Sequence, residues 1–182
     1  KEDKMLYEEF LNGNDDAFNI IINKYTEKLI YFIYTYVKNM EVAKDLSQDV
    51  FVYLWLHKDC YNSKYSLKTY LYIIAKSRAL NYLKREKRII FIGREQLLEQ
   101  ENELIDVEEI VFKNLQKNDV INAMKKLNSE QAKVLYLANI EGFKYEEISK
   151  ILGKKLGQVK SLIHRARKNM KKILDEEVMK NV

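Results

Sequence analysis

A run of cations near the end of the chain has the residue types and spacing that bind phosphates. Between residues 153 and 172 there are eight Lys or Arg residues and no acidic residue. Apolar residues recur at helical spacing in the same run, so one side is apolar and the cations lie on the others. These apolar residues are Val159, Leu162, Ile163 and Ala166. The pattern predicts a basic amphipathic helix.

A short helix and a glycine turn precede this basic helix. Ile148, Ile151 and Leu152 share one side of the first helix, and Gly153 can end it. The whole predicts a helix-turn-helix over 145–172, whose second helix can lie in the major groove of duplex DNA. A solvated face or a protein-docking helix is the alternative for this segment taken alone.

A second basic segment carries aromatic rings at its start. Residues 68–88 hold seven cations and one acid, and Tyr61, Lys64, Tyr65 and Tyr70 lie at or just ahead of its first turn. Rings can stack on unpaired bases while cations follow the backbone, so this combination suits single-stranded nucleic acid. With thirteen tyrosines in the chain, core or surface positions are the alternative for each ring.

A third candidate segment, 41–57, is two-faced. At 100° per residue, an apolar side is opposed by a side that bears two carboxylates and an amide, with an aromatic anchor at its edge. The apolar side is Ala43, Leu46, Val50 and Leu54, and the other side is Asp45, Gln48, Asp49 and Val52 with Trp55. The second side is either solvated or a docking surface for a basic partner helix.

The elements that position these residues are all expected to be helices, because the chain has no proline and only five glycines. The expected helices are 6–12, one capped by Asp15 or Asp16 and reaching Tyr36, 41–57, one from Ser66 to Arg88, 117–126, 129–139 after Asn128, 145–152 and 156–174. We expect two small all-α domains, 1–90 and 113–182, joined by an acidic linker over 91–112.

Composition excludes several classes of protein. His57 and His164 are the only histidines and Cys60 the only cysteine, so we expect no metal site, disulfide, cofactor or enzymatic activity. The net charge of +5 suits an anionic partner. No apolar run is long enough to span a bilayer and no signal-like segment opens the chain, so we expect a cytoplasmic protein without membrane insertion. The leading Lys1 suggests that the natural start lies upstream.

Three motifs, read in order, resemble the two domains of bacterial sigma factors of the extracytoplasmic function (ECF) group. They are EVAKDLSQDVFVYLW, LKTYLYIIAKSRALNYLKREKR and LNSEQAKVLYLANIEGFKYEEISKILGKKLGQVKSLIHRAR. The likeness covers nearly all of the chain outside the linker. It is specific because three separate motifs occur in the family's order and spacing, whereas many regulators share a helix-turn-helix.

The resemblance implies a function, its partners and its site residues. A sigma factor directs core RNA polymerase to promoters, and its partners are the polymerase (the coiled coil of the largest subunit and the flap), promoter DNA both duplex and single-stranded, and in many cases an anti-sigma factor. By position, the polymerase contact is Asp45, Gln48, Asp49, Val52 and Trp55. The −10 contact is the loop over 59–66 and the basic helix, with Tyr61, Lys64, Tyr65, Tyr70, Lys76, Arg78, Lys84, Arg85 and Arg88. The −35 contact is Gln158, Lys160, Ser161, His164, Arg165, Arg167 and Lys168.

Some positions depart from the family's pattern. Tyr70 stands where Trp is frequent, Ser77 where Asn is frequent, and Lys144 where Ser or Thr caps a helix. Gln158 replaces a frequent Thr and Leu162 a frequent Arg. These changes leave the apolar pattern intact, so they bear on promoter preference rather than on fold.

Two other functions compete with the sigma reading. One is a helix-turn-helix regulator that binds duplex DNA and never joins polymerase. The other is a scaffold whose domains bind only protein, which leaves the cation-rich helices unexplained. Both DNA-binding readings predict an affinity that falls steeply with salt.

Overall fold

The computed structural model describes residues 2–61, 64–92, 123–124 and 126–180. All regular elements in these ranges are helices, which confirms the expected all-α class. The chain divides into two compact units, Lys1–Val107 and Glu108–Val182, whose border lies outside the described residues. None of the helices in the described ranges is long and apolar enough to cross a membrane.

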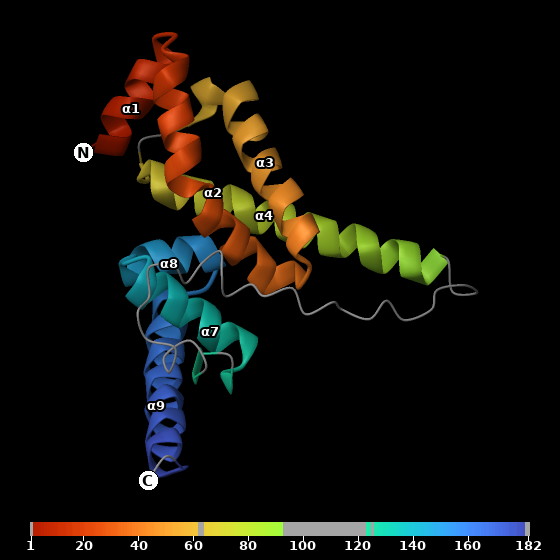
Figure 1. The fold of residues 1–182 in the computed structure, drawn as a ribbon. Helices are drawn as coiled ribbons and strands as arrows, with labels where there is room; N and C mark the ends of the chain where they lie inside the picture. Colours follow the sequence, from red (N-terminus) through yellow and green to blue (C-terminus); the bar gives the residue numbers. More distant parts are fainter. Residues whose placement is uncertain (1, 62–63, 93–122, 125, 181–182) are drawn as a thin grey trace. The chain divides into compact units, whose positions relative to one another are not determined.

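The amino-terminal unit is built around one long helix. Its described elements are α1 (Glu2–Leu11), α2 (Asp15–Val37), α3 (Met40–Leu56), the short 3-10 helix η1 (Lys58–Cys60) and α4 (Leu67–Ile92). α2 packs against α1, α3 and α4, and the second half of α4 extends beyond the other helices of the unit (Figure 1). Each predicted helix of this unit is present, with ends that differ by a few residues.

The apolar stripe predicted on α2 forms the centre of the core. Its buried members are Phe18, Ile21, Tyr25, Leu29, Phe32 and Ile33. Burying one such side chain contributes about 1.5–3 kcal/mol relative to leaving it in water, so this stripe is a large part of what holds the unit together. Ile22 and Tyr36, at the margins of the stripe, are only half-buried.

Helix starts in this unit are capped by polar side chains. The expected cap of α2 at Asp15 or Asp16 is wrong, because the Asn14 side chain accepts hydrogen bonds from the backbone N–H groups of Asp16 and Ala17. The two aspartates instead occupy the first turn, where negative charge suits the helix dipole. Ser66 caps α4 as expected, since its hydroxyl accepts from the N–H of Thr69 at 3.1 Å.

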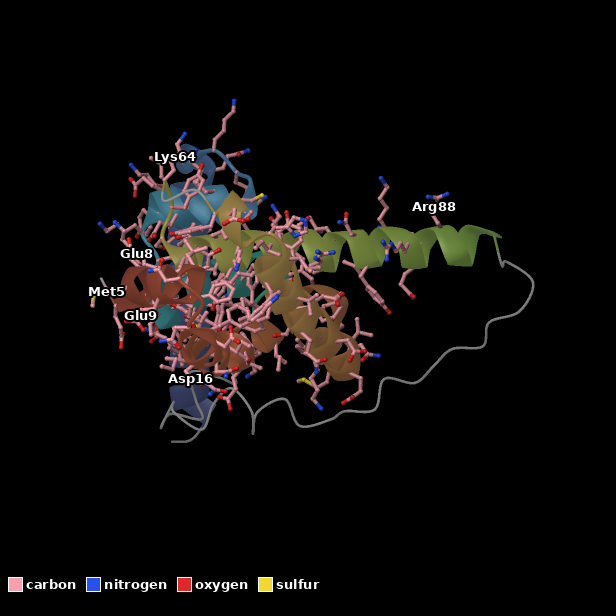
Figure 2. All side chains as sticks on the ribbon, turned by 90° about the horizontal axis from the view of Figure 1, so that it is seen from above. Met5, Glu8, Glu9, Asp16, Lys64 and Arg88 are labelled. Carbon is pink, nitrogen blue, oxygen red and sulfur yellow. The ribbon has the colours of Figure 1, made fainter. Side chains whose placement is uncertain are left out.

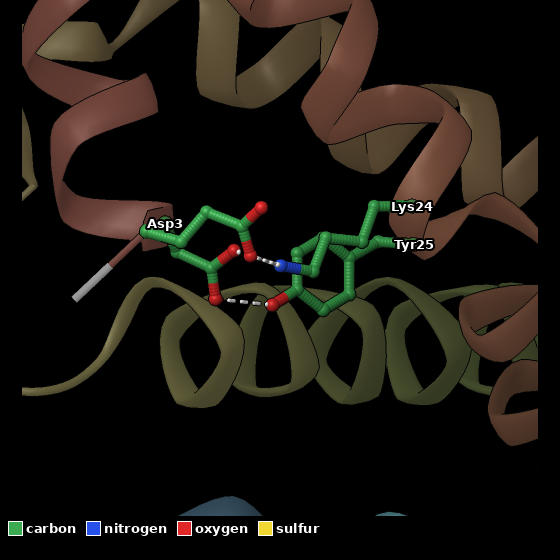
Figure 3. Close-up of polar contacts among 4 residues, drawn as sticks. Asp3, Lys24 and Tyr25 are labelled. Carbon is green, nitrogen blue, oxygen red and sulfur yellow. Dashed lines mark hydrogen bonds and ion pairs between the residues drawn. The ribbon is translucent and has the colours of Figure 1, made fainter.

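Polar contacts tie α1 to the neighbouring α2. The Asp3 carboxylate accepts a 2.6 Å hydrogen bond from the Tyr25 hydroxyl and pairs with the Lys24 ammonium at 2.7 Å (Figure 3). Burial raises the pKa of Asp3, but the hydrogen bonds from Lys24 and Tyr25 outweigh it and leave the pKa below its ordinary value. The ionised Asp3 carboxylate therefore holds the first turn of α1 against α2.

In the carboxy-terminal unit the described elements are α7 (Ser129–Leu135), the π-helical turn η2 (Tyr136–Ile140), α8 (Tyr145–Leu152) and α9 (Leu156–Lys180). The helix expected over 129–139 is thus divided, because the hydrogen bond from Glu141 N–H to the Tyr136 carbonyl widens its last turn. Asn128 caps α7 as expected. Most of the helix expected over 117–126 and nearly all of the expected linker lie outside the described residues.

The predicted helix-turn-helix is confirmed. α8 ends at Gly153, whose φ of 64° is the left-handed conformation that glycine tolerates. Ile148 and Ile151 of α8 are buried, as are the predicted apolar positions of α9, Val159, Leu162, Ile163 and Ala166. Lys144 offers no capping hydroxyl at the start of α8, but the Glu147 carboxylate accepts from the Lys144 backbone N–H at 2.9 Å.

Candidate protein-docking and nucleic-acid interfaces

One side of α3 presents all five predicted docking residues to solvent. Asp45, Gln48 and Asp49 are exposed, and the apolar Val52 and Trp55 are 55% and 43% exposed. The opposite side, with Ala43, Leu46, Val50 and Leu54, is buried. Large apolar side chains exposed beside carboxylates are unusual on a surface that faces only water.

Three of these five residues open into a groove of about 750 Å³ between α2 and α3. The groove is lined by Phe18, Ile22, Asn23, Thr26, Glu27, Ser47, Gln48, Phe51, Val52, Trp55 and Leu56. Asp45 and Asp49 are not among the lining residues and stand on the exposed side of α3 beside it. The α2 contribution was missed from the sequence, although the marginal place of Ile22 on its stripe was a usable signal.

The Trp55 ring lines this groove and packs against two other aromatic rings. Its centroid lies 5.1 Å from that of Phe10 on α1 and 5.0 Å from that of Phe18 on α2. Each contact of this kind contributes about 0.5–1.5 kcal/mol of stabilisation beyond that from burying the surface of the rings. The groove therefore offers a rigid aromatic anchor beside carboxylates, which suits a partner helix with apolar and basic residues.

The predicted −10 aromatic residues lie together where η1 leads into α4. The Tyr61 hydroxyl donates to the Tyr65 carbonyl at 2.6 Å, and the Tyr61 ring lies 5.3 Å from that of Tyr70. Tyr7 of α1, which sequence reasoning missed, contacts the Tyr61 ring at 4.8 Å. All four tyrosines are buried or half-buried, and Lys64 is exposed.

The predicted cations of α4 fall into two groups. Lys84, Arg85 and Arg88 are exposed on the half of the helix that extends beyond its neighbours. Figure 2 shows Arg88 there, far along α4 from the end where Lys64 lies. Lys76 and Arg78 are half-buried, and the Arg78 guanidinium lies 4.9 Å from the centroid of the Tyr53 ring on α3. The first group is available to a phosphate chain, whereas Arg78 also stabilises the packing of α3 on α4.

The predicted −35 residues share the exposed surface of α9. They are Gln158, Lys160, Ser161, His164, Arg165, Arg167 and Lys168, and all seven are exposed. The Gln158 side-chain oxygen accepts from the Lys155 backbone N–H at 2.8 Å, so one of its two lone pairs is used, and the other lone pair and the NH₂ group are left to meet a base. Arg167 donates to the Asn139 side chain at 3.3 Å.

An acid that sequence reasoning missed borders this surface. The Glu130 carboxylate of α7 pairs with Lys154 at 2.9 Å, and this hydrogen bond lowers the pKa of Glu130. Both residues line a hollow of about 320 Å³ together with Gly157, Gln158, Ser161, Leu162 and Arg165. No cluster of metal-ligating side chains is found in the part of the chain that the structure describes.

Comparison with known proteins identifies the family. The family model "Sigma-70 region 2" matches residues 21–89, and "Sigma-70, region 4" matches residues 117–170, together more than half of the chain. The chain belongs to the sigma-70 family. It is a sigma factor that directs RNA polymerase to promoters, an initiation factor and not an enzyme. A regulator that never joins polymerase is not favoured.

Relatives place this sigma factor in the ECF group, as the motifs indicated. It is 29% identical over 168 residues to the RNA polymerase sigma factor YlaC of Bacillus subtilis (strain 168), covering 89% of this chain and 96% of YlaC. It is 27% identical over 173 residues to the ECF RNA polymerase sigma-E factor of Escherichia coli (strain K12), covering 91% of this chain and 90% of that protein.

Solved structures support the fold. RpoE from Bartonella quintana, crystallised in complex with the anti-sigma factor NepR, matches with a TM-score of 0.65 at 22% identity over 87% of this chain and 96% of that one. CnrH, in complex with the cytosolic domain of CnrY, matches with a TM-score of 0.64 at 20% identity over 97% of this chain and 99% of that one.

Proposed function

We propose that each of the three surfaces described above binds a different target of this sigma factor. The groove between α2 and α3, with the acidic side of α3, docks on a helical, basic surface of core RNA polymerase. The η1–α4 aromatic residues and the cations of α4 hold the unpaired −10 strand, and α9 reads the −35 duplex. Residues 1–90 and 113–182 would form the two domains, with 91–112 as linker.

The observation that carries the docking proposal is the exposed Trp55 on the wall of an apolar groove beside Asp45 and Asp49. Such a surface suits a partner that has apolar anchors and cations on one helix. The −10 proposal is supported by the cluster of rings followed by exposed cations at Lys84, Arg85 and Arg88. The −35 proposal is supported by the exposed surface of the first part of α9, because the chain has cations and no acid over 153–172.

The same proposal implies a cellular location and one further partner. Because promoters and polymerase are cytoplasmic in bacteria, we place the working protein in the cytoplasm. An anti-sigma factor would block the same surfaces, and both structural relatives named above were solved in complexes, one of them with an anti-sigma factor.

The test is capture of purified bacterial core RNA polymerase at moderate salt by the wild-type chain and by Asp49→Lys. Reversing an exposed carboxylate at a docking surface is expected to lower core affinity by about 100-fold or more, with unfolding unchanged. Glu8→Lys on α1 is the matched control, because it makes the same charge change at an exposed residue outside the proposed surface. Equal capture by wild type and Asp49→Lys would refute the docking surface.

A further inference from the structure

Tyr7 of α1 connects this helix to the segment that leads into α4. It is 2% exposed, and its hydroxyl donates to the backbone carbonyl of Lys58 in η1 at 2.7 Å. Its ring meets the Tyr61 ring at 4.8 Å and 70°, an edge-to-face contact. The region 2 family match covers residues 21–89, so Lys58 and Tyr61 lie inside it, whereas α1 with Tyr7 lies outside it.

Tyr61 is held from three directions. α1 supplies the Tyr7 ring, α4 supplies the Tyr70 ring at 5.3 Å, and the Tyr61 hydroxyl donates to the Tyr65 carbonyl at 2.6 Å. The hydrogen bond from Tyr7 to Lys58 fixes the backbone three residues before Tyr61. Tyr7 is therefore the contact from α1 that sets both the backbone and the ring at the start of the proposed −10 segment.

The Tyr7 hydroxyl is not needed to fill space, because a phenylalanine ring would pack against Tyr61 and Phe10 in the same place. What the hydroxyl adds is one directed hydrogen bond to a carbonyl outside any long helix. A tyrosine hydroxyl is protonated at neutral pH and so remains a donor, and burial, with the neighbouring Tyr70 and Tyr61, raises the pKa of Tyr7 further.

We propose that Tyr7 is a positioning residue for −10 recognition: it holds Lys58 and Tyr61 in the arrangement that receives an unpaired base. The inference rests on the proposed role of the η1–α4 segment in −10 capture. A base leaves the stack at a cost of a few kcal/mol, so a site that is already ordered binds it better than one that must become ordered.

The test compares Tyr7→Phe with Tyr25→Phe in holoenzyme assembled from core polymerase and the full chain. Each variant loses one tyrosine hydroxyl bond that ties α1 to the rest of its unit, but only Tyr7 reaches η1. The probes are single-stranded DNA oligonucleotides that carry the −10 sequence selected by wild-type holoenzyme from a randomised library, intact or with one abasic site at each position in turn.

For the intact oligonucleotide, we expect Tyr7→Phe to bind about 3- to 10-fold more weakly than wild type, and Tyr25→Phe to bind like wild type. At the abasic position that weakens wild type most, Tyr7→Phe and wild type should bind equally, because the base that the segment holds is gone. Core affinity, affinity for −35 duplex and the unfolding midpoint are expected to change little. If Tyr7→Phe caused a general loss of structure, these three values would change, and its binding deficit would persist on the abasic oligonucleotide.

Three results would overturn the inference: two concern Tyr7 alone, and the third concerns the proposed base capture. If wild type shows a sensitive abasic position but Tyr7→Phe binds like Tyr25→Phe, or keeps its deficit at that position, Tyr7 does not act through base capture. If wild type shows no sensitive position at all, the proposal that this segment captures a base is wrong, and so is the positioning role of Tyr7.

Discussion

The two units of this sigma factor build their candidate interfaces in different ways. In the amino-terminal unit, the aromatic residues expected to bind partners are also packing residues: the Trp55 ring contacts Phe10 and Phe18, and the Tyr61 ring contacts Tyr7 and Tyr70. In the carboxy-terminal unit, the seven −35 residues are exposed, and the buried residues of α9 form a separate set. In the first unit the same aromatic residues are thus expected to stabilise the fold and to bind partners, whereas in the second unit different residues have these two roles.

The difference follows from the ligands that the surfaces suit. An apolar partner or an unstacked base needs aromatic rings held rigidly, which only a packed core supplies. Phosphates need cations, and these remain exposed because burying an unpaired charge is costly. Substitutions of the aromatic binding residues should therefore affect stability and binding together in the first unit, and substitutions of the cations of α9 should affect binding alone in the second.

The largest expected effect is that of Trp55→Ala. We expect the free energy of unfolding of the amino-terminal unit to fall by about 2 kcal/mol, because the contacts with Phe10 and Phe18 are lost, and core polymerase affinity to fall about 30-fold or more. Trp55 is the only tryptophan, so unfolding is followed by circular dichroism rather than fluorescence. Leu11→Ala, which removes a 38% exposed apolar side chain of α1 outside the groove, is the control and should change both values little. If Trp55→Ala lowers affinity without lowering stability, the shared role is wrong.

A smaller effect on binding, with none on folding, is expected for cations of α9. Arg165→Ala should weaken binding to −35 duplex about 10-fold and relax preference at one base pair, whereas Lys168→Ala should weaken all duplexes alike by a few-fold. Both variants should unfold within about 0.5 kcal/mol of wild type. The measurement is duplex titration across salt for selected and scrambled sequences. A large loss of stability in either variant would contradict the separation of binding from folding.

The smallest effects concern two helix ends with the same backbone conformation. Gly153 ends α8 at φ 64°, and Lys38 ends α2 at φ 57°, where a side chain is strained. Gly153→Ala should destabilise the carboxy-terminal unit by about 1 kcal/mol. Lys38→Gly should stabilise the amino-terminal unit by about 0.5 kcal/mol at most, because the added freedom of the unfolded chain offsets the relief of strain. Changes of the same sign in the two variants, measured by urea unfolding, would refute this account.

Local sequence pattern was enough for most helices and for the helix-turn-helix. Periodicity separated Val50 and Leu54 from Asp49 on α3, and it separated Ile163 from His164 on α9, because each side chain's direction depends only on its position along its own helix. Errors arose where neighbours competed for one role. Asn14 rather than Asp15 caps α2, since three adjacent polar residues give the same signal.

The sequence by itself determined the family, the all-α class and the exposed residues of α3 and α9, because these follow from the order of motifs and from helical periodicity. Only the tertiary structure decided that α2 completes the groove beside Trp55, that Glu130 borders the exposed surface of α9 that we propose for −35 binding, and that Tyr7 holds Lys58 from 51 positions away along the chain. Such contacts join separate helices, and no periodicity within one helix records which side chain of another will lie against it.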